Sequence, residues 1–350
     1  MIQHYAIQPI RPGSGRHVAI AVPARAEAAT IESCLGAIDV AAARSGALSI
    51  VVVVLVNNSD DATAMLARRF VARHCAVIVE DITLSPAHAG SARAAALDRA
   101  ACELPPDGIL MTSDADSEVA PDWIAANLAE FDAGVDAVAG VVAFNAAAWA
   151  QLPPIRAERG LEWRLADLHA RLGTLLDPVS HDPWPNHIWA WGASLAVTVA
   201  AYHAVDGMPV VPLAEDRAFA SRIQAHDLRL RHSHAPVVYT SARQCGRAPG
   251  GFADLIRAYS TGRDDPCDAA LEPTRLLVRR LQRRALCRAE GATGFGVPWA
   301  AIEASDRDLA RCRLYPHELP REVALATRLI EGLETQQGDP AGLPAFAAEA

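Results

Sequence analysis

The sequence predicts an α/β fold with a mostly parallel central sheet flanked by helices, followed by a C-terminal helical region. The first half of the chain alternates short runs of valine, isoleucine and alanine with longer, alanine-rich amphipathic stretches. One of the short runs, SIVVVVLV at 49–56, is apolar almost without interruption, which is typical of a strand covered by helices on both faces. Strands and helices that alternate in this way predict parallel strands joined by helical crossovers.

The expected elements follow one another in this order. Strands are expected at 17–23, 49–56, 75–80 and 107–112, with helices between them at 27–45, 60–73 and 86–102. After Pro121 we expect a helix, a strand near 136–144, a helix at about 154–176 and an aromatic loop at 181–191. A strand at 192–199, a helix at 213–226 and a short strand at 236–239 come next, and from about Gly250 the pattern is helical, with a break at 291–298.

The charge balance and the cysteines exclude several classes of protein. The 350 residues carry 32 basic side chains, all of them arginine, against 41 acidic ones, for a formal net charge of -9. A protein that binds nucleic acid through its phosphates needs a net basic surface, so nucleic acid is not expected as a partner. The seven cysteines are scattered and form no CxxC pair, which indicates reduced thiols rather than a zinc ribbon or a disulfide framework.

No segment of the sequence predicts a signal peptide or a transmembrane helix. The N-terminus lacks a long apolar stretch, and the most apolar run, at 48–56, is about half the length that spans a bilayer. We therefore expect a cytoplasmic protein. The basic amphipathic segment Arg275 to Arg288 leaves two alternatives open: a peripheral contact with the cytoplasmic face of the inner membrane, or a helix packed on one side and solvated on the other.

Polar or acidic residues follow three of the expected strands, at Pro23–Glu27, Asn57–Asp61 and Ser113–Ser117. In parallel sheets ligands bind beyond the carboxyl ends of the strands, so these segments are the expected binding site. Asp114 and Asp116, one residue apart at a strand end, can both approach one divalent cation, and their hard oxygen ligands suit Mg²⁺ or Mn²⁺. A turn that caps the next helix is the structural alternative.

The other two strand ends also have two interpretations. Pro23 and Glu27 would border a pocket at the sheet edge, or Glu27 would only favour the dipole of the helix that it opens. Asn57 and Asn58 would hydrogen-bond a nucleobase or a ribose, or they would only form a turn before the next helix. The residues alone do not choose between these interpretations.

Three features further along the chain are candidates for chemistry. The acidic pair Glu215-Asp216 opens a helix, where it would favour the dipole or supply a general base for an acceptor hydroxyl. The aromatic loop ends with Trp189 and Trp191, and tryptophan faces bind sugars as well as filling cores. His232 and His234 are candidates for a third metal ligand, against the alternative of ordinary surface or core histidines.

Six segments share their order and spacing with one known family. VAIAVPARAEAATIESCLGAI resembles the opening strand and helix of the glycosyltransferases of family 2, VNNSDDAT resembles their second-strand loop, and HAGSARAAALDRA resembles the entry to their third helix. GILMTSDADSEVAPDWI is similar to the DxD strand, GASLAVTVAAYHAVDGMPVVPLAEDRAFASRI to the acceptor-side block with its ED motif, and VVYTSARQCGR to the strand and arginine downstream. The match covers about residues 15 to 250.

This resemblance implies the GT-A (nucleotide-diphospho-sugar transferase) fold and an inverting single displacement that moves a sugar from a nucleotide diphosphate to an acceptor hydroxyl. It implies that Asp116 holds Mg²⁺ or Mn²⁺, that Asp114 contacts the donor ribose or a water on the metal, and that Glu215 orients the general base Asp216. The implied donor-binding residues are Pro23, Glu27, Asn57, Asn58, Gly90, Asp114 and Asp116, and the implied acceptor-binding residues are Trp189, Trp191 and Gly192.

The chain departs from the family pattern at two places. Ala26 stands where the family has asparagine, and Asn57-Asn58 stands where it has an acidic pair. The identity of the nucleotide base is therefore not determined, and a UDP-sugar is the default donor with a GDP-sugar as the alternative. The tryptophan that follows the arginine in the QxxRW signature of processive synthases is missing after Arg247, which predicts a non-processive enzyme. The sequence does not identify the acceptor, which is either a saccharide or a lipid-linked molecule.

The resemblance also divides the chain into parts. We expect an N-terminal extension at 1–15, a donor-binding part at 16–145, an acceptor-binding and catalytic part at 146–250, a C-terminal helical region at 251–335 and a disordered tail at 336–350.

Two alternatives of other classes remain open. A metal-dependent phosphohydrolase acting on a nucleotide or sugar phosphate would use Asp114 and Asp116 but would need neither the acidic pair Glu215-Asp216 nor the aromatic loop. A non-catalytic relative would bind the nucleotide sugar without turning it over. A dinucleotide oxidoreductase is excluded, because Gly13-Ser-Gly15 precedes the first strand whereas the dinucleotide fingerprint follows it.

Overall fold

The computed structural model describes residues 15–153, 157–247, 251–260, 265–291 and 294–337. The chain divides into two compact units, one formed by 1–154 with 189–261 and the other by 155–188 with 262–350. The expected N-terminal extension, apart from Gly15, and the expected tail beyond residue 337 lie outside the described residues.

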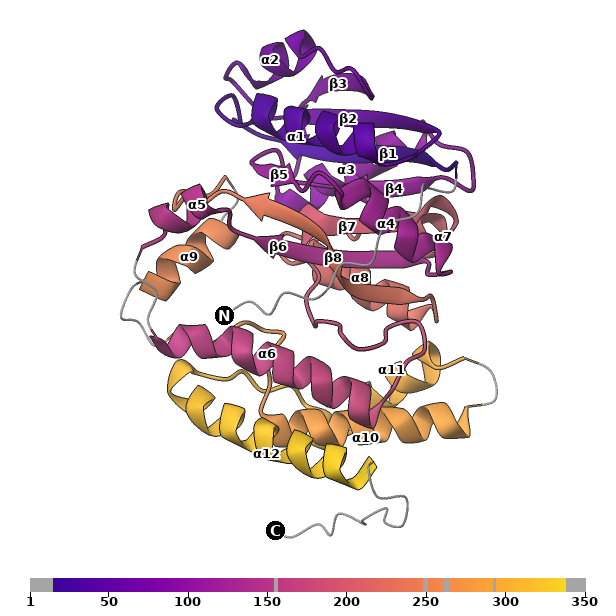
Figure 1. The fold of residues 1–350 in the computed structure, drawn as a ribbon, viewed down its shortest axis with the longest axis vertical. Helices are drawn as coiled ribbons and strands as arrows, with labels where there is room; N and C mark the ends of the chain where they lie inside the picture. The colour runs from indigo at the N-terminus through magenta and orange to yellow at the C-terminus, as the bar shows by residue number, and fades with distance from the viewer. Residues whose placement is uncertain (1–14, 154–156, 248–250, 261–264, 292–293, 338–350) are drawn as a thin grey trace. The chain divides into compact units, whose positions relative to one another are not determined.

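Within the described part of the first unit, eight strands form one sheet in the order β3-β2-β1-β4-β7-β6-β8-β5 (Figure 1). The strands are β1 (His17–Ala24), β2 (Ser49–Asn57), β3 (Ala76–Ile82), β4 (Ile109–Thr112), β5 (Ser117–Val119), β6 (Ala137–Ala143), β7 (Leu195–Thr198) and β8 (Leu230–Thr240). Parallel pairing joins β3, β2, β1 and β4, and again β6 with β8. Strand β7 runs antiparallel to both β4 and β6, and β5 runs antiparallel to β8. The four expected strands of the first half are confirmed to within two residues at each end.

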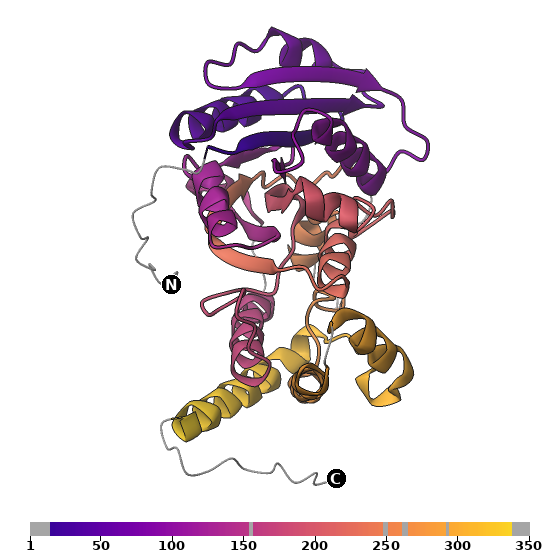
Figure 2. The same cartoon turned by 90° about the vertical axis from the view of Figure 1, so that its right-hand side faces the viewer.

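Helices cover both faces of this sheet, as the apolar run at 49–56 predicts. Alternate residues of a strand point to opposite faces, so Val18, Ile20 and Val22 of β1 pack with α1 while Ala19 and Ala21 pack with α3. Figures 1 and 2 show α1 and α3 on opposite sides of the strands. The helices of this unit are α1 (Ile31–Arg44), α2 (Thr63–Arg69), α3 (Ala89–Ala101), α4 (Trp123–Asp132), α5 (Ala146–Gln151), α7 (Val199–Ala204), α8 (Glu215–Ala225) and α9 (Phe252–Ser260), with a 3₁₀ turn η1 (Gly192–Ser194).

Helices α1 and α2 begin later than the sequence predicts, because the residues before them form turns that are tied to one another. Helix α1 was expected from Glu27 and begins at Ile31, and α2 was expected from Asp60 and begins at Thr63. The Asp61 carboxylate accepts bonds from Thr63 N (3.0 Å) and from Ala28 N (3.1 Å), which joins the two turns. The sequence pattern also misses β5, whose three residues pair with the end of β8.

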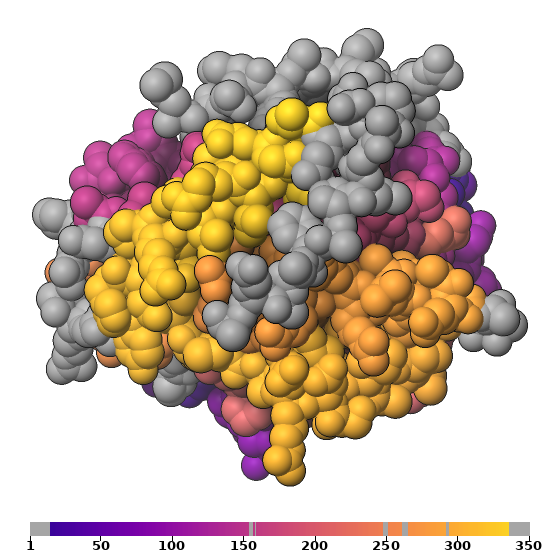
Figure 3. Space-filling view, turned by 90° about the horizontal axis from the view of Figure 1, so that it is seen from below, coloured from indigo at the N-terminus to yellow at the C-terminus, as the bar shows by residue number. Residues whose placement is uncertain are grey.

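The second unit is helical in its described part. It contains α6 (Ala157–Leu176), α10 (Thr274–Glu290), α11 (Gly296–Ser305) and α12 (Leu319–Gln337), with short 3₁₀ turns η2 (Arg307–Leu309) and η3 (Pro316–Glu318). Helix α6 packs against α12 and α10, and on the face drawn in Figure 3 the yellow α12 lies beside orange residues of α10 and α11. The expected helical region after residue 250 is therefore confirmed, and α6 belongs with it.

Three of the six arginines of the basic segment at 275–288 donate hydrogen bonds to described residues of this unit. Arg280 is buried and donates to both oxygens of Glu272 at 2.9 Å. Arg284 and Arg288 each donate to Asp177 at 2.8 Å and lie over the ring of Phe295. The segment is a helix packed on one side, and a contact of its exposed side with a membrane stays a prediction. Among the described residues, no helix is long and apolar enough to cross a membrane.

Candidate functional site

The loops after β1 and β2 are tied together at the carboxyl ends of these strands. Ala26 N donates to Ser59 Oγ and Glu27 N donates to Thr63 Oγ1, both at 2.8 Å. Ala26 makes this approach with a positive φ of 53°, an unusual conformation for a residue with a side chain. The two loops therefore hold Glu27 at a fixed place at the edge of the sheet.

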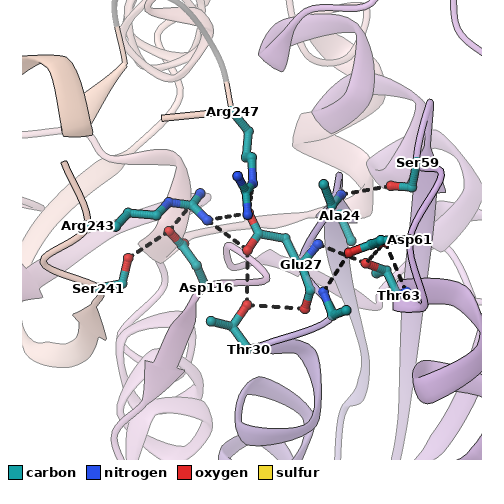
Figure 4. A network of polar contacts seen from close by, with 12 residues as sticks. Ala24, Glu27, Thr30, Ser59, Asp61, Thr63, Asp116, Ser241, Arg243 and Arg247 are labelled. Atoms are coloured by element: carbon teal, nitrogen blue, oxygen red, sulfur yellow. Dashed lines mark hydrogen bonds and ion pairs between the residues drawn. The ribbon is translucent and has the colours of Figure 1, made fainter. Parts of the chain in front are cut away.

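An arginine connects Glu27 to Asp116 in the acidic turn that follows β4. Arg243 Nη1 donates to both carboxylate oxygens of Glu27, at 2.6 and 2.7 Å, and Arg243 Nη2 lies 2.9 Å from Asp116 Oδ2 (Figure 4). Ser241 Oγ donates to the same Asp116 oxygen at 3.1 Å. The pairing of Ser117 with Thr240 explains this arrangement, because the chain leaves β8 directly beside the acidic turn.

A second arginine joins Asp114 to the acidic pair Glu215-Asp216. Arg93, on α3, is buried, with its Nε 3.0 Å from Glu215 Oε1 and its Nη2 2.8 Å from Asp114 Oδ1. Its Nη1 donates to Gly192 O at 2.9 Å and to Thr112 Oγ1 at 3.0 Å. Two carboxylates and two neutral acceptors therefore surround one cation, which satisfies a charge that would be costly to bury alone.

Gly192 lies between Arg93 and Asp216. Its carbonyl accepts from Arg93, and its N–H donates to Asp216 Oδ2 at 2.9 Å. A side chain at this position would place its Cβ 2.5 Å from Arg93 Cζ, so any residue other than glycine would force Arg93 or the loop to shift. The Asp216 Oδ1 atom accepts from Arg217 N at 2.8 Å.

The position of Asp216 changes its acidity. Burial raises the pKa of the Asp216 carboxyl above its ordinary value, and the neighbouring Glu215 adds to the rise, whereas Arg93 and the two N–H donors act in the opposite direction. A carboxylate with a raised pKa is a better proton acceptor than an exposed aspartate. The environment of Asp216 therefore suits the role of a general base.

The acidic turn fits a divalent cation. Burial raises the pKa of Asp116 to about 6, and Asp114 and Glu27 contribute to the rise while Arg243 opposes it. A cation bound there would relieve this repulsion. Among the described residues, no group of three or more His, Cys, Asp or Glu side chains is placed to hold a metal. Mg²⁺ usually takes only one or two carboxylates and completes its shell with water and substrate phosphate, so Asp114 and Asp116 suffice.

The two candidate histidines are not placed to join such an ion. His232 of β8 pairs with Ala139 of β6, whereas Tyr239, near the end of β8, pairs with Ala143. Four residue steps along β6, roughly 13 Å, therefore separate His232 from the end of β8, where the chain meets Asp116. His234 lies in the irregular stretch of β8 between these two pairs, opposite Gly140. The suggestion that either histidine supplies a third ligand at Asp116 is therefore not supported.

The asparagines after β2 bond the backbone. Asn57 Nδ2 donates to Ala24 O at 3.2 Å. Asn58 has a positive φ of 48°, and its side chain donates to Leu84 O at 3.2 Å and accepts from Leu84 N at 3.1 Å. These bonds correspond to the turn-forming interpretation, and base recognition by either side chain stays a prediction.

The other residues named from the sequence lie as follows. Pro23 is in β1, opposite Leu55 of β2. Gly90 is in the first turn of α3, where a Cβ would lie 2.1 Å from Val211 O, so the glycine allows a close backbone contact. Trp189 and Trp191 stack with ring centroids 5.4 Å apart, and Trp189 is only 8% exposed. Trp191 is the more exposed of the two rings.

Sequence reasoning missed the two arginines that organise the site. Arg93 stands alone among alanines in SARAAAL, and a single charged residue on an otherwise small, apolar helix face was the available signal. Arg243 was included only as part of the downstream segment VVYTSARQCGR. In both residues the guanidinium connects carboxylates from distant parts of the chain.

The family model described as glycosyl transferase family 2 matches residues 19–186. No curated protein matches the chain. This match confirms the resemblance drawn from the sequence, and the eight-stranded sheet with its covering helices agrees with the fold class that the resemblance implies.

Several solved structures are similar to the chain. TarS residues 1–349 from S. aureus, in complex with UDP-GlcNAc, is 15% identical with a TM-score of 0.47, and 92% of each chain is covered. The mannosyltransferase PcManGT from Pyrobaculum calidifontis, in complex with GDP-Man and Mn²⁺, is 19% identical with a TM-score of 0.46, covering 93% of this chain and 88% of that chain. Glucosyl-3-phosphoglycerate synthase from Mycobacterium tuberculosis, in complex with Mn²⁺, UDP and phosphoglyceric acid, is 19% identical with a TM-score of 0.41, covering 70% and 77%.

Proposed function

Residues 19–186 belong to glycosyl transferase family 2, and from this premise we propose that the chain is a metal-dependent, inverting, non-processive glycosyltransferase. It moves a sugar from a nucleotide diphosphate donor to an acceptor hydroxyl. The observation that carries this proposal is the bridge made by Arg93, which lies between Asp114 on one side and the acidic pair Glu215-Asp216 on the other. An acid suited to the donor and a base suited to the acceptor are thereby held in one cluster.

On the donor side, Asp116 would hold the metal and Asp114 would contact the donor ribose or a water on the metal. A bound Mg²⁺ or Mn²⁺ would neutralise the charge of the diphosphate leaving group. Glu27, held between the two loops and Arg243, lies at the edge of the pocket with Pro23 and the asparagine pair Asn57-Asn58. A UDP-sugar is the default donor and a GDP-sugar the alternative.

On the acceptor side, Asp216 accepts the proton of the attacking hydroxyl. The acceptor oxygen forms a bond to the anomeric carbon while the bond from that carbon to the diphosphate oxygen breaks, so the configuration inverts and the nucleotide diphosphate leaves. The raised pKa of Asp216 supports this role. Its two backbone N–H donors keep the carboxylate oriented, and Glu215, fixed by Arg93, lies beside it.

The acceptor would approach over Gly192, next to the stacked Trp189 and Trp191. Since Trp189 is nearly buried, Trp191 is the ring that would contact a sugar, and Trp189 would support it. Both a saccharide and a lipid-linked acceptor suit this arrangement.

A turnover assay tests the proposal. The protein is incubated with Mn²⁺, a panel of UDP- and GDP-sugars and a mixture of acceptors, and the released nucleotide diphosphate and the glycosylated product are measured by mass spectrometry. We expect release to require an acceptor. The Asp216→Asn variant should lose transfer by about 10²- to 10⁴-fold, the usual contribution of a general base, while it still binds the donor.

The same assay tests the alternative classes. Release of a nucleoside monophosphate with a sugar 1-phosphate, or of inorganic phosphate, that is equally fast without an acceptor and persists in Asp216→Asn, would indicate a phosphohydrolase. Donor binding without any release in the presence of every acceptor would indicate a non-catalytic relative.

A further inference from the structure

One oxygen of the proposed metal ligand is already held by a positive charge. Asp116 Oδ2 lies 2.9 Å from Arg243 Nη2 and accepts from Ser241 Oγ at 3.1 Å. The same guanidinium is anchored on Glu27, whose two oxygens lie 2.6 and 2.7 Å from Nη1. Figure 4 shows Arg243 reaching both carboxylates.

A divalent cation and this guanidinium compete for the negative charge of the same carboxylate. A metal ion bound to Asp116 would lie close to the guanidinium, and the two positive charges repel each other. The ion pair is also shielded from water, since the Asp116 side chain is 13% exposed and the Glu27 side chain 6%. Water therefore screens the repulsion less than it would at an open surface.

The two bonds to Glu27 give Arg243 an alternative position. If the Asp116 contact breaks, the Nη1 atom can stay on Glu27 while the Nη2 atom swings away. The Arg243 side chain is 29% exposed, so it is not enclosed by the core and can move. Arg243 follows the end of β8 rather than lying within the strand, which also permits movement.

We propose that, in the absence of donor, the Arg243 guanidinium is the cation that pairs with Asp116 in the donor site. Binding of a metal at Asp116 therefore depends on the nucleotide diphosphate. This inference rests on the proposed function. Free metal alone gains too little to displace the arginine. A metal that enters with a diphosphate brings negative charge, so the guanidinium can leave Asp116 without an unpaired positive charge remaining in the pocket.

Arg247 provides a matched control. Its Nε lies 3.8 Å from Glu27 Oε1, and its side chain is 45% exposed. Removing Arg247 takes the same charge from the same neighbourhood without removing the bond to Asp116. Any difference between the two variants therefore reports the contact itself and not the general loss of positive charge.

The experiment measures the affinity of Mn²⁺ alone by calorimetry or by electron paramagnetic resonance, for the wild-type full chain and for Arg243→Gln, Arg247→Gln and Arg243→Gln with Asp116→Asn. We expect Arg243→Gln to bind Mn²⁺ about tenfold more tightly than the wild type, and Arg247→Gln to differ by less than about twofold. Adding Asp116→Asn should remove the gain, because the two residues are coupled through one contact. An unchanged or weaker Mn²⁺ affinity in Arg243→Gln would overturn the proposal.

A second arm separates this inference from the proposed function. UDP or GDP should raise the Mn²⁺ affinity of the wild type, and should raise that of Arg243→Gln by a smaller factor. If neither nucleotide binds any of the proteins, the proposed function fails, while the Mn²⁺ comparison still decides whether Arg243 competes with the metal. If Arg243→Gln does not fold, Arg243→Met removes the charge and keeps a long side chain, and its Mn²⁺ affinity should likewise exceed that of the wild type.

Discussion

Arg93 Nε lies 3.0 Å from Glu215 Oε1, and no more than 8% of either side chain is exposed. The contact joins the helix that follows β3 to the helix that carries Asp216. Because the same guanidinium also reaches Asp114, one side chain connects Asp114 to the acidic pair Glu215-Asp216. The stability of the site and its chemistry therefore depend on the same residue.

The first prediction concerns this ion pair. Arg93→Met leaves Glu215 buried without its partner, and such a change typically costs about 3–5 kcal/mol of unfolding free energy. Adding Glu215→Met should recover part of the loss, since the unpaired buried carboxylate is then gone. Urea denaturation of the three proteins measures this. If Arg93→Met lost less than about 1 kcal/mol of unfolding free energy, water rather than Arg93 would solvate the Glu215 carboxylate.

The second prediction concerns Gly192. In Gly192→Ala the new methyl group would lie 2.5 Å from Arg93 Cζ, so either the arginine or the loop must shift. We expect a loss of about 1–3 kcal/mol in stability, as for other overpacked sites, together with a loss of turnover. Gly36→Ala is the control, because a Cβ there meets nothing within 4 Å in helix α1, and it should stabilise the protein by about 0.4–1 kcal/mol. Equal effects of the two substitutions on the melting temperature would argue against the close contact.

The third prediction concerns the pH dependence of stability without metal. The folded protein binds the Asp116 proton more tightly than the unfolded chain, because the pKa rises from 3.8 to about 6. The stability contributed by this group is fully present below pH 3.8 and is lost as the pH rises through about 6, an effect on the order of 3 kcal/mol. Asp116→Asn should flatten that part of the curve, whereas Asp107→Asn, at an exposed position, should not. Denaturation in chelator between pH 4 and pH 7 provides the comparison, and parallel curves for all three proteins would contradict the assignment.

The fourth prediction concerns the pH dependence of turnover. A general base must be deprotonated, so kcat/KM falls as the pH falls through the pKa of Asp216. Burial and Glu215 raise that pKa, so the acid limb should lie above pH 3.8, the ordinary value for an aspartate. Saturating Mn²⁺ keeps protonation of Asp116 from limiting the rate. An acid limb at or below pH 3.8 would argue that Asp216 only holds Gly192 in place.

The fifth prediction concerns the basic helix α10. Arg284 and Arg288 both depend on Asp177, whose side chain is 3% exposed. Asp177→Asn removes the negative charge that both arginines share, and we expect it to destabilise the protein by about 3 kcal/mol or more. Arg275→Gln, at an exposed position on the same helix, should change stability by less than about 0.5 kcal/mol. Similar melting temperatures for the two variants would mean that the segment does not pack as described.

The sequence predicted the candidate site best where its residues directly follow a strand. The alternation of strands and helices placed the loops at Glu27, Asn58 and Asp116 on one edge of the sheet, and the structure brings the first and last of them together through Arg243. The starts of α1 and α2 were placed too early, because the turns before them depend on hydrogen bonds such as that between Asp61 and Ala28, which no local pattern reveals.

The arginine bridges could not be read from the sequence, because a pattern of residue types does not say which charges will be buried together. Arg93 meets Glu215 across 122 positions of the chain and Arg243 meets Glu27 across 216. The positive φ of Ala214, at the start of the helix that carries Asp216, was equally invisible, because alanine gives no signal for that conformation. Helix α6 was recognised as a helix, but its packing with α10 and α12 depends on tertiary contacts.

The most direct test of the central claim is calorimetry of the purified protein with UDP, GDP and their sugar conjugates, with and without Mn²⁺, repeated on Asp116→Ala. We expect one nucleotide to bind, Mn²⁺ to strengthen its binding, and Asp116→Ala to remove the effect of the metal. Binding of no nucleotide under any of these conditions, or binding that Asp116→Ala leaves unchanged, would contradict the proposed donor site.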